Sequence, residues 1–226
     1  MPRDTLIRQI NHIRDEILIL GSMVEQATLS AVQALKNRDI HLAHEIFEAD
    51  QTINEKRFAI ENAIITLMAT QQPMARDLRE MTAMLEVNTE LERMGDYAKG
   101  IAKVVTRLGE SEANIPIQEI EKMADISVSM LHRALGAFVS ENHIQALAIP
   151  KEDDQVDELF NQAYRKIIEA MIANPNLIDH TNLMLWVIHN LERLADRVTN
   201  ICERTVFSAT GELFEIDSMD EDDANV

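Results

Sequence analysis

The chain has 226 residues, 46% of them hydrophobic and 27% charged, which is typical of globular proteins and unlike disordered ones. Aromatic residues make up only 4% while methionine occurs 12 times, so we expect a core of aliphatic side chains and methionine, which helices tolerate well. The formal net charge of −18 would repel phosphate backbones and anionic lipid headgroups, which argues against nucleic acid and lipid as partners.

The expected compartment is the cytoplasm. Cys202 is the only cysteine and cannot form an internal disulfide, and no charged-then-apolar leader with a cleavage site opens the chain. The longest stretch without a charged residue, 62–75, is shorter than the roughly 20 residues that span a bilayer. We therefore expect no direct membrane insertion, so that any membrane association passes through a protein partner.

Apolar residues recur at alternating steps of three and four near the start of the chain, which predicts one long amphipathic helix. The same spacing returns over 91–108 and 191–201. No segment alternates between apolar and polar residues, so no strands are expected. The first apolar seam consists of Ile10, Ile13, Ile17, Leu20, Val24, Ala27, Ala31 and Ala34.

Groups of turn-forming residues divide the chain into six long helices. These groups lie at 37–39, 71–73, 109–116, 140–142 and 174–176. Pro150 falls where the fifth helix should continue, and a proline there either kinks that helix or delays its start.

The chain repeats itself. Residues 91–96 read Leu-Glu-Arg-Met-Gly-Asp, and residues 191–196 read Leu-Glu-Arg-Leu-Ala-Asp. Two blocks upstream also correspond: Asp50, Ile53 and Asn54 match Asp153, Val156 and Asp157, and Ala34, Leu35 and Ala43 match Ala137, Phe138 and Ala146. The sequence therefore predicts an all-α chain of two tandem three-helix bundles, 1–112 and 113–212, followed by an acidic and disordered tail, 213–226.

Carboxylates recur within the repeat. Glu92 and Asp96 are four residues apart, so they project from one helix face about one turn apart, and Glu192 with Asp196 repeat the arrangement. The preceding helix of each bundle carries a similar couple, and antiparallel packing could bring the couples together. All-oxygen clusters suit magnesium, manganese, iron or calcium. The candidate metal ligands are Asp50, Glu92, Asp96, Asp153, Asp157, Glu192 and Asp196.

A simpler interpretation of these carboxylates stays open. They can be solvated surface groups, with Arg93 and Arg193 offering local ion pairs worth well under about 1 kcal/mol. His189 could join the second cluster as a nitrogen ligand, although a core or surface role is the commoner one for a histidine.

Patterns of catalytic residues are missing from the sequence. No histidine has a glutamate three residues before it, as a ferritin-like di-iron oxidase requires. The sequence has no glycine-rich phosphate loop, no Gly-x-Ser-x-Gly motif and no cysteine paired with a plausible base. We expect a protein that binds partners and is not an enzyme.

Residues 72–79, read as Gln-Pro-Met-Ala-Arg-Asp-Leu-Arg, together with 91–96 resemble the second and third helices of the PhoU family. Residues 191–196, 200–201 and 210–212 extend the resemblance to the second half. The resemblance implies two three-helix bundles and a cytoplasmic regulator, expected to form a homodimer. Such a regulator contacts the ATPase subunit of a phosphate ABC transporter and a sensor histidine kinase, and restrains the phosphate-starvation response when phosphate is plentiful.

The resemblance also implies metal clusters, of divalent or iron-type ions, on the candidate carboxylates, with Asp50 as a partial match. Three positions depart from the family pattern. Asn54 stands where an aspartate is often found, and Tyr97 and Arg197 stand where a histidine often follows the motif. Two functions therefore remain: a regulatory adaptor, and a carboxylate bundle that serves as a metalloenzyme or metal buffer.

Overall fold

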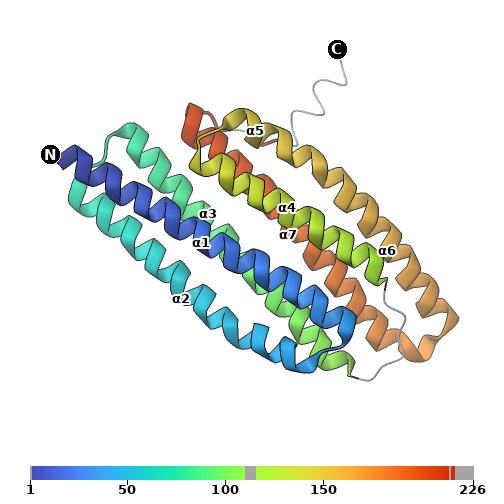
Figure 1. Cartoon of the computed structure of the whole chain (residues 1–226). Helices are drawn as coiled ribbons and strands as arrows, with labels where there is room; N and C mark the ends of the chain where they lie inside the picture. The colour runs from blue at the N-terminus through green and yellow to red at the C-terminus, as the bar shows by residue number, and fades with distance from the viewer. Residues whose placement is uncertain (1, 110–115, 214, 217–226) are drawn as a thin grey trace, which may run out of the picture.

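The computed structural model describes residues 2–109, 116–213 and 215–216, and in these ranges the chain is helical without strands. Two three-helix bundles lie side by side (Figure 1). The first consists of α1 (Pro2–Asn37), α2 (Ile40–Gln71) and α3 (Ala75–Leu108). The second consists of α4 (Ile117–Val139), α7 (Ile178–Thr210) and a third helical segment, which the 3₁₀ turn Ile149–Glu152 divides into α5 (His143–Ala148) and α6 (Asp153–Ala173). Another 3₁₀ turn, Pro175–Leu177, precedes α7. The predicted fold class is confirmed.

The helix ends coincide with the predicted breaks for local reasons. Asp39 caps α2 by accepting a hydrogen bond from the backbone N–H of Leu42 at 3.0 Å. Gln72 ends α2 in the left-handed conformation, with a φ of 47°, and is followed by Pro73. Pro150 lies in the 3₁₀ turn between α5 and α6, because proline lacks the N–H that an uninterrupted helix requires there.

Two predicted boundaries lie largely outside the described residues. The division between the bundles, at 112–113, falls in the undescribed stretch 110–115, and most of the predicted tail is undescribed too. The first part of that tail nevertheless contacts the second bundle. The backbone N–H of Ile216 donates to Oε1 of Glu203 at 3.0 Å, and its side chain packs against the core.

The predicted seam of α1 faces the core. Its residues are buried except Ala27, which is partly buried, and Ile17, Leu20 and Val24 have no exposed surface. Each such large side chain contributes about 1.5–3 kcal/mol through its removal from water. By length and composition alone, one described helix, α1, is apolar enough to cross a membrane, although 44% of its most apolar window is buried inside the bundle.

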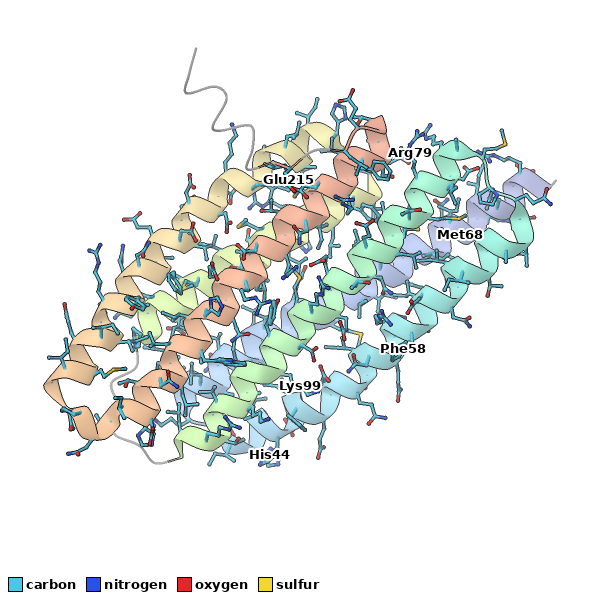
Figure 2. The ribbon with its side chains drawn as sticks, turned by 180° about the vertical axis from the view of Figure 1, so that it is seen from behind. His44, Phe58, Met68, Arg79, Lys99 and Glu215 are labelled. Carbon is cyan, nitrogen blue, oxygen red and sulfur yellow. The ribbon has the colours of Figure 1, made fainter. Side chains whose placement is uncertain are left out.

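The bundles meet along two helix pairs. α3 packs on α7 and α1 packs on α4, and Figure 2 shows α3 and α7 running side by side when the molecule is seen from behind. Glycines permit the close approach. A methyl group at Gly100 would lie 2.1 Å from Cη2 of Trp186, and one at Gly21 would lie 2.1 Å from Cδ1 of Leu135. Each glycine therefore receives a large side chain from the other bundle.

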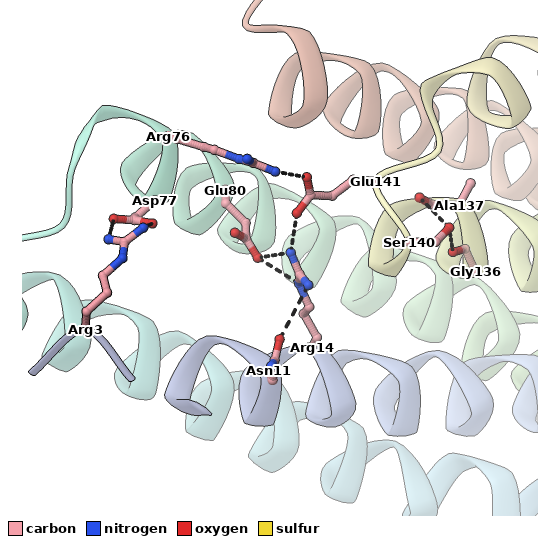
Figure 3. Close-up of polar contacts among 10 residues, drawn as sticks. All are labelled: Arg3, Asn11, Arg14, Arg76, Asp77, Glu80, Gly136, Ala137, Ser140 and Glu141. Atoms are coloured by element: carbon pink, nitrogen blue, oxygen red, sulfur yellow. Dashed lines mark hydrogen bonds and ion pairs between the residues drawn. The ribbon is translucent and has the colours of Figure 1, made fainter. Parts of the chain in front are cut away.

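Ion pairs connect the bundles at the end where α3 begins (Figure 3). Nη2 of Arg14, on α1, lies 2.6 Å from Glu80 on α3 and 2.6 Å from Glu141 in the turn after α4. Arg76 contacts the other carboxylate oxygen of Glu141 at 2.5 Å. Burial raises the pKa of Glu141, but its hydrogen bonds to Arg76 and Arg14 outweigh burial and lower it overall. Glu141 thus stays ionised and joins the two bundles.

Candidate functional site

The first carboxylate cluster lies between α2 and α3. Asp50 is buried on α2, Glu92 is partly buried on α3, and Asp96 is exposed one turn further along α3. Burial and the neighbouring charge of Asp50 raise the pKa of Asp96. Burial, followed by the charge of Asp96, raises the pKa of Glu92. The two predicted couples therefore come within electrostatic range of each other.

A lysine that the sequence analysis did not single out lies in this cluster. Lys99 lies on α3 (Figure 2). Its Nζ is 2.6 Å from Oδ2 of Asp50, and Nδ2 of Asn54 donates to the same oxygen at 2.9 Å. The ammonium also lies 5.2 Å from the ring centroid of Phe47. The sequence signal that could have indicated this lysine is a difference between the repeats. Lys99 is three residues after Asp96, whereas Thr199 is three residues after Asp196.

The second cluster lies between α6 and α7. Oε2 of the partly buried Glu192 is 3.2 Å from Nδ1 of His189. Burial raises the pKa of Glu192, as do the charges of Asp196 and Asp157, so these three carboxylates also interact. Asp157 and Asp196 are exposed, and Asp153 is partly buried at the start of α6.

The two clusters differ in how well they suit a metal ion. Among the described residues, no three His, Cys, Asp or Glu side chains form a ligand set as they stand. In the first cluster an ammonium already lies on Asp50, so the donor set does not fit a cation. The second cluster offers carboxylates and an imidazole, with Thr199 in place of the lysine, and this donor chemistry suits a divalent or iron-type ion.

The two arginines of the repeated block contact other residues than expected. Arg93 donates to Glu90 at 3.0 Å, and the guanidinium of Arg193 lies 5.1 Å from the ring centroid of Tyr97. The charge of Arg93 also acts on Glu92, so Arg93 offsets part of the negative charge of the first cluster.

Tyr97 and Arg197, which stand where a histidine often follows the family motif, contact each other at the α3–α7 interface. Burial acts to lower the pKa of Arg197, but its hydrogen bond to Tyr97 and the charge of Glu90 raise it overall. Nη1 of Arg197 lies 3.3 Å from Oε2 of Glu90. Tyr97 and Arg197 thus join the bundles to each other.

An apolar groove of about 690 Å³ lies between α1 and α2. Its lining includes buried residues such as Ile46 and Ile53, and exposed ones such as Ile19. Its polar lining residues include Glu45 and Gln26. This groove gives the first bundle an apolar surface that is open to solvent, the usual character of a contact site for another molecule.

The sequence and the fold both match known proteins. The PhoU domain family model matches residues 17–105 and 120–205, one match in each bundle. A phosphate-specific transport system accessory protein PhoU homolog of Clostridium acetobutylicum is 34% identical over 212 residues, which cover 93% of this chain and 97% of that protein.

Two solved structures have the same fold. The phosphate transport system regulatory protein PhoU from Streptococcus pneumoniae aligns with a TM-score of 0.84 and 33% identity, over 92% of this chain and 99% of that one. PhoU from Pseudomonas aeruginosa aligns with a TM-score of 0.85 and 29% identity, over 91% of this chain and 99% of that one. With a family match in both bundles and relatives similar along nearly the whole length, the chain belongs to the PhoU family.

Proposed function

We propose that this protein is a cytoplasmic adaptor that regulates phosphate uptake and phosphate-starvation signalling. It binds the ATPase subunit of a phosphate ABC transporter and a sensor histidine kinase, and it represses the starvation response when phosphate is abundant. The observation that carries the proposal is its similarity, over more than nine tenths of its length, to proteins named as accessory or regulatory components of phosphate transport. The same names favour a regulator over the metalloenzyme or metal buffer.

The architecture supports a role in binding. The glycine contacts and the ion pairs of Glu141 and Arg197 hold the two bundles together as a scaffold. The groove between α1 and α2 offers a contact surface, and a chain with a net charge of −18 favours partners with basic surfaces. The adaptor acts by choosing between partners, without catalysing a reaction.

Deletion of the gene tests this proposal. In the deletion strain, a reporter of phosphate-scavenging genes should be active even at high phosphate, and a plasmid with the wild-type gene should silence it. A Leu20→Asp variant, which places a charge at a fully buried position, should fail to restore repression. Repression that persists in a deletion strain without a paralogue would contradict the proposal.

Contact with the two partners and self-association are tested separately. Affinity capture from cells grown at high and low phosphate should recover the transporter ATPase and the kinase, in proportions that change with phosphate. Light scattering of the purified protein should give twice the 25.7 kDa chain mass, as expected for a homodimer. Recovery of neither partner in either condition would contradict the adaptor.

Metal binding at the second cluster is a further part of the proposal. Asp153, Asp157, Glu192 and Asp196 would hold the ion, with His189 beside Glu192. Burial, followed by the charges of Asp196 and Asp157, raises the pKa of Glu192, and a bound ion would offset that repulsion. It would add about 2.7 kcal/mol of stability at a hundredfold excess over its dissociation constant. Calorimetry with manganese should therefore show a higher melting temperature for the wild type, and little change for the Glu192→Gln/Asp196→Asn variant. Identical melting curves with and without manganese would sink this part and leave the adaptor intact.

A further inference from the structure

The first cluster contains a cation of its own. Lys99 places its ammonium 2.6 Å from Oδ2 of Asp50, a carboxylate whose side chain is only 5% exposed. A lysine is protonated at neutral pH, and the charges of Asp96 and Glu92 also act on this ammonium, so it interacts with all three carboxylates. It thus supplies the positive charge that a bound metal ion would otherwise supply.

The surroundings of Lys99 hold the ammonium in place. Asn54 donates to the same oxygen of Asp50, so that this oxygen already accepts two hydrogen bonds. The ring of Phe47 lies 5.2 Å from the ammonium and adds a cation–π contact. The ammonium is tethered to the same helix as Glu92 and Asp96, and a tethered group has a high effective concentration at its site. An ion from solution would have to displace it.

Access does not protect the cluster from metal ions. Asp50, Asn54 and Lys99 line a surface hollow of about 750 Å³, and the Lys99 side chain is 30% exposed. A dissolved ion can therefore reach Asp50, where it has to compete with the tethered ammonium.

The second repeat carries different residues at two of these positions. Thr199 stands at the position of Lys99, and Asp157 stands at the position of Asn54. A neutral hydroxyl and an additional carboxylate thus replace the ammonium and the amide donor. Both repeats contain the Glu-x-x-x-Asp couple, but the residue three positions after the aspartate is a lysine in the first repeat and a threonine in the second.

We infer that Lys99 is the resident counter-ion of the Asp50–Glu92–Asp96 cluster, and that this cluster takes no metal ion. Any divalent-ion response of the protein then comes from the second bundle alone. The two halves of the repeat thus differ at this point: the first carries a lysine on its carboxylates, and the second has a threonine at the equivalent position.

Manganese is the probe for the test, with bound ion counted by electron paramagnetic resonance and stability followed by calorimetry on the full chain. Glu92→Gln/Asp96→Asn should bind the same amount of manganese as the wild type. Lys99→Met keeps the length of the side chain but removes its charge. Its melting temperature without metal should fall by about 3–12 °C, as expected for the loss of a charged hydrogen bond.

Manganese should then substitute for the missing ammonium. It should restore most of the stability that Lys99→Met loses, and adding Asp50→Asn to that variant should abolish the restoration. Lys103→Met removes the same charge from an exposed position one turn along α3, and should change neither stability nor manganese binding.

Two results would overturn the inference. One is a lower manganese content in Glu92→Gln/Asp96→Asn than in the wild type, because the first cluster would then be a metal site. The other is a Lys99→Met variant as stable as the wild type, or one that manganese does not restore. The first measurement uses a variant that retains Lys99 and Asp50, so it stands even where Lys99→Met does not fold. If the wild type binds no manganese at all, the inference about Lys99 still holds. That result would contradict the separate proposal that the second cluster binds a metal ion.

Discussion

Replacing Gly100 by alanine should push Trp186 out of the contact between the bundles. An added methyl group would lie 2.1, 2.8 and 3.2 Å from three ring atoms of Trp186, where carbon atoms in contact are about 3.5–4.0 Å apart. The ring must therefore move by more than an ångström. Because Trp186 is already 44% exposed, it can swing toward solvent instead of unfolding the helix.

The expected size of the effect comes from two opposing contributions. Alanine is better than glycine inside a helix by about 0.8–1 kcal/mol. Overpacking costs about 1–3 kcal/mol. Gly136→Ala, in α4, isolates the first contribution because nothing lies within 4 Å of the added methyl group. Gly100→Ala should therefore be less stable than Gly136→Ala by about 1–3 kcal/mol, or roughly 2–12 °C in melting temperature for a chain of this size.

Circular dichroism during urea or thermal unfolding gives the stability difference, and intrinsic fluorescence gives the position of the ring. Trp186 is the single tryptophan, so the emission reports on this contact alone. Its maximum should shift to longer wavelength in Gly100→Ala and stay unchanged in Gly136→Ala. Equal stabilities and unchanged emission in both variants would refute the claim that Gly100 is needed for the approach of the bundles.

Three further predictions concern Cys202, Gln72 and the Glu92–Asp96 couple. Cys202 is buried, and burial raises its pKa to about 12, so it should react with a thiol reagent only after the chain unfolds; rapid reaction of the folded protein would contradict this placement. Gln72→Gly should raise stability by about 1 kcal/mol, measured by urea unfolding, because residue 72 has a φ of 47°, which glycine adopts without strain. The Glu92→Gln/Asp96→Asn variant should be more stable than the wild type at neutral pH. The pKa values of both acids are raised in the folded state, so their ionisation destabilises the folded wild type as the pH rises through these pKa values. The stability advantage of the variant should disappear at pH values below the ordinary pKa values of Glu92 and Asp96, 4.5 and 3.8. A difference between the melting temperatures of variant and wild type that does not change with pH would contradict this prediction.

Most of the fold could be predicted because it depends on local physics. The seam of α1 follows from helical periodicity, and the helix ends follow from residues such as Asp39 and Pro150 that cap or interrupt a helix wherever they occur. The pairing of α3 with α7 could not be predicted in this way. It depends on small positions such as Gly100, whose importance is visible only once the partner side chain is in place.

The candidate site was predicted less completely, because the partners of long charged side chains depend on the register of neighbouring helices. Part of each predicted set comes within electrostatic range across its helix pair: Asp50 with Glu92 and Asp96, and Asp157 with Glu192. Lys99 lies 49 residues from Asp50 in the sequence, and nothing local indicates that its ammonium reaches back to α2. Likewise, Tyr97 and Arg197 are separated by the whole second bundle up to α7, and their contact exists only because the bundles pack together.

The groove between α1 and α2 has a practical consequence for measuring this protein's stability. Environment-sensitive dyes such as SYPRO Orange and anilinonaphthalene sulfonate become fluorescent on apolar surfaces that are open to water, and the folded first bundle already presents one. A dye-based melt should therefore begin from a high signal, and the dye, by occupying the native state, should itself raise the transition temperature. Circular dichroism or the emission of Trp186 reports the same transition without a reagent that competes for the groove.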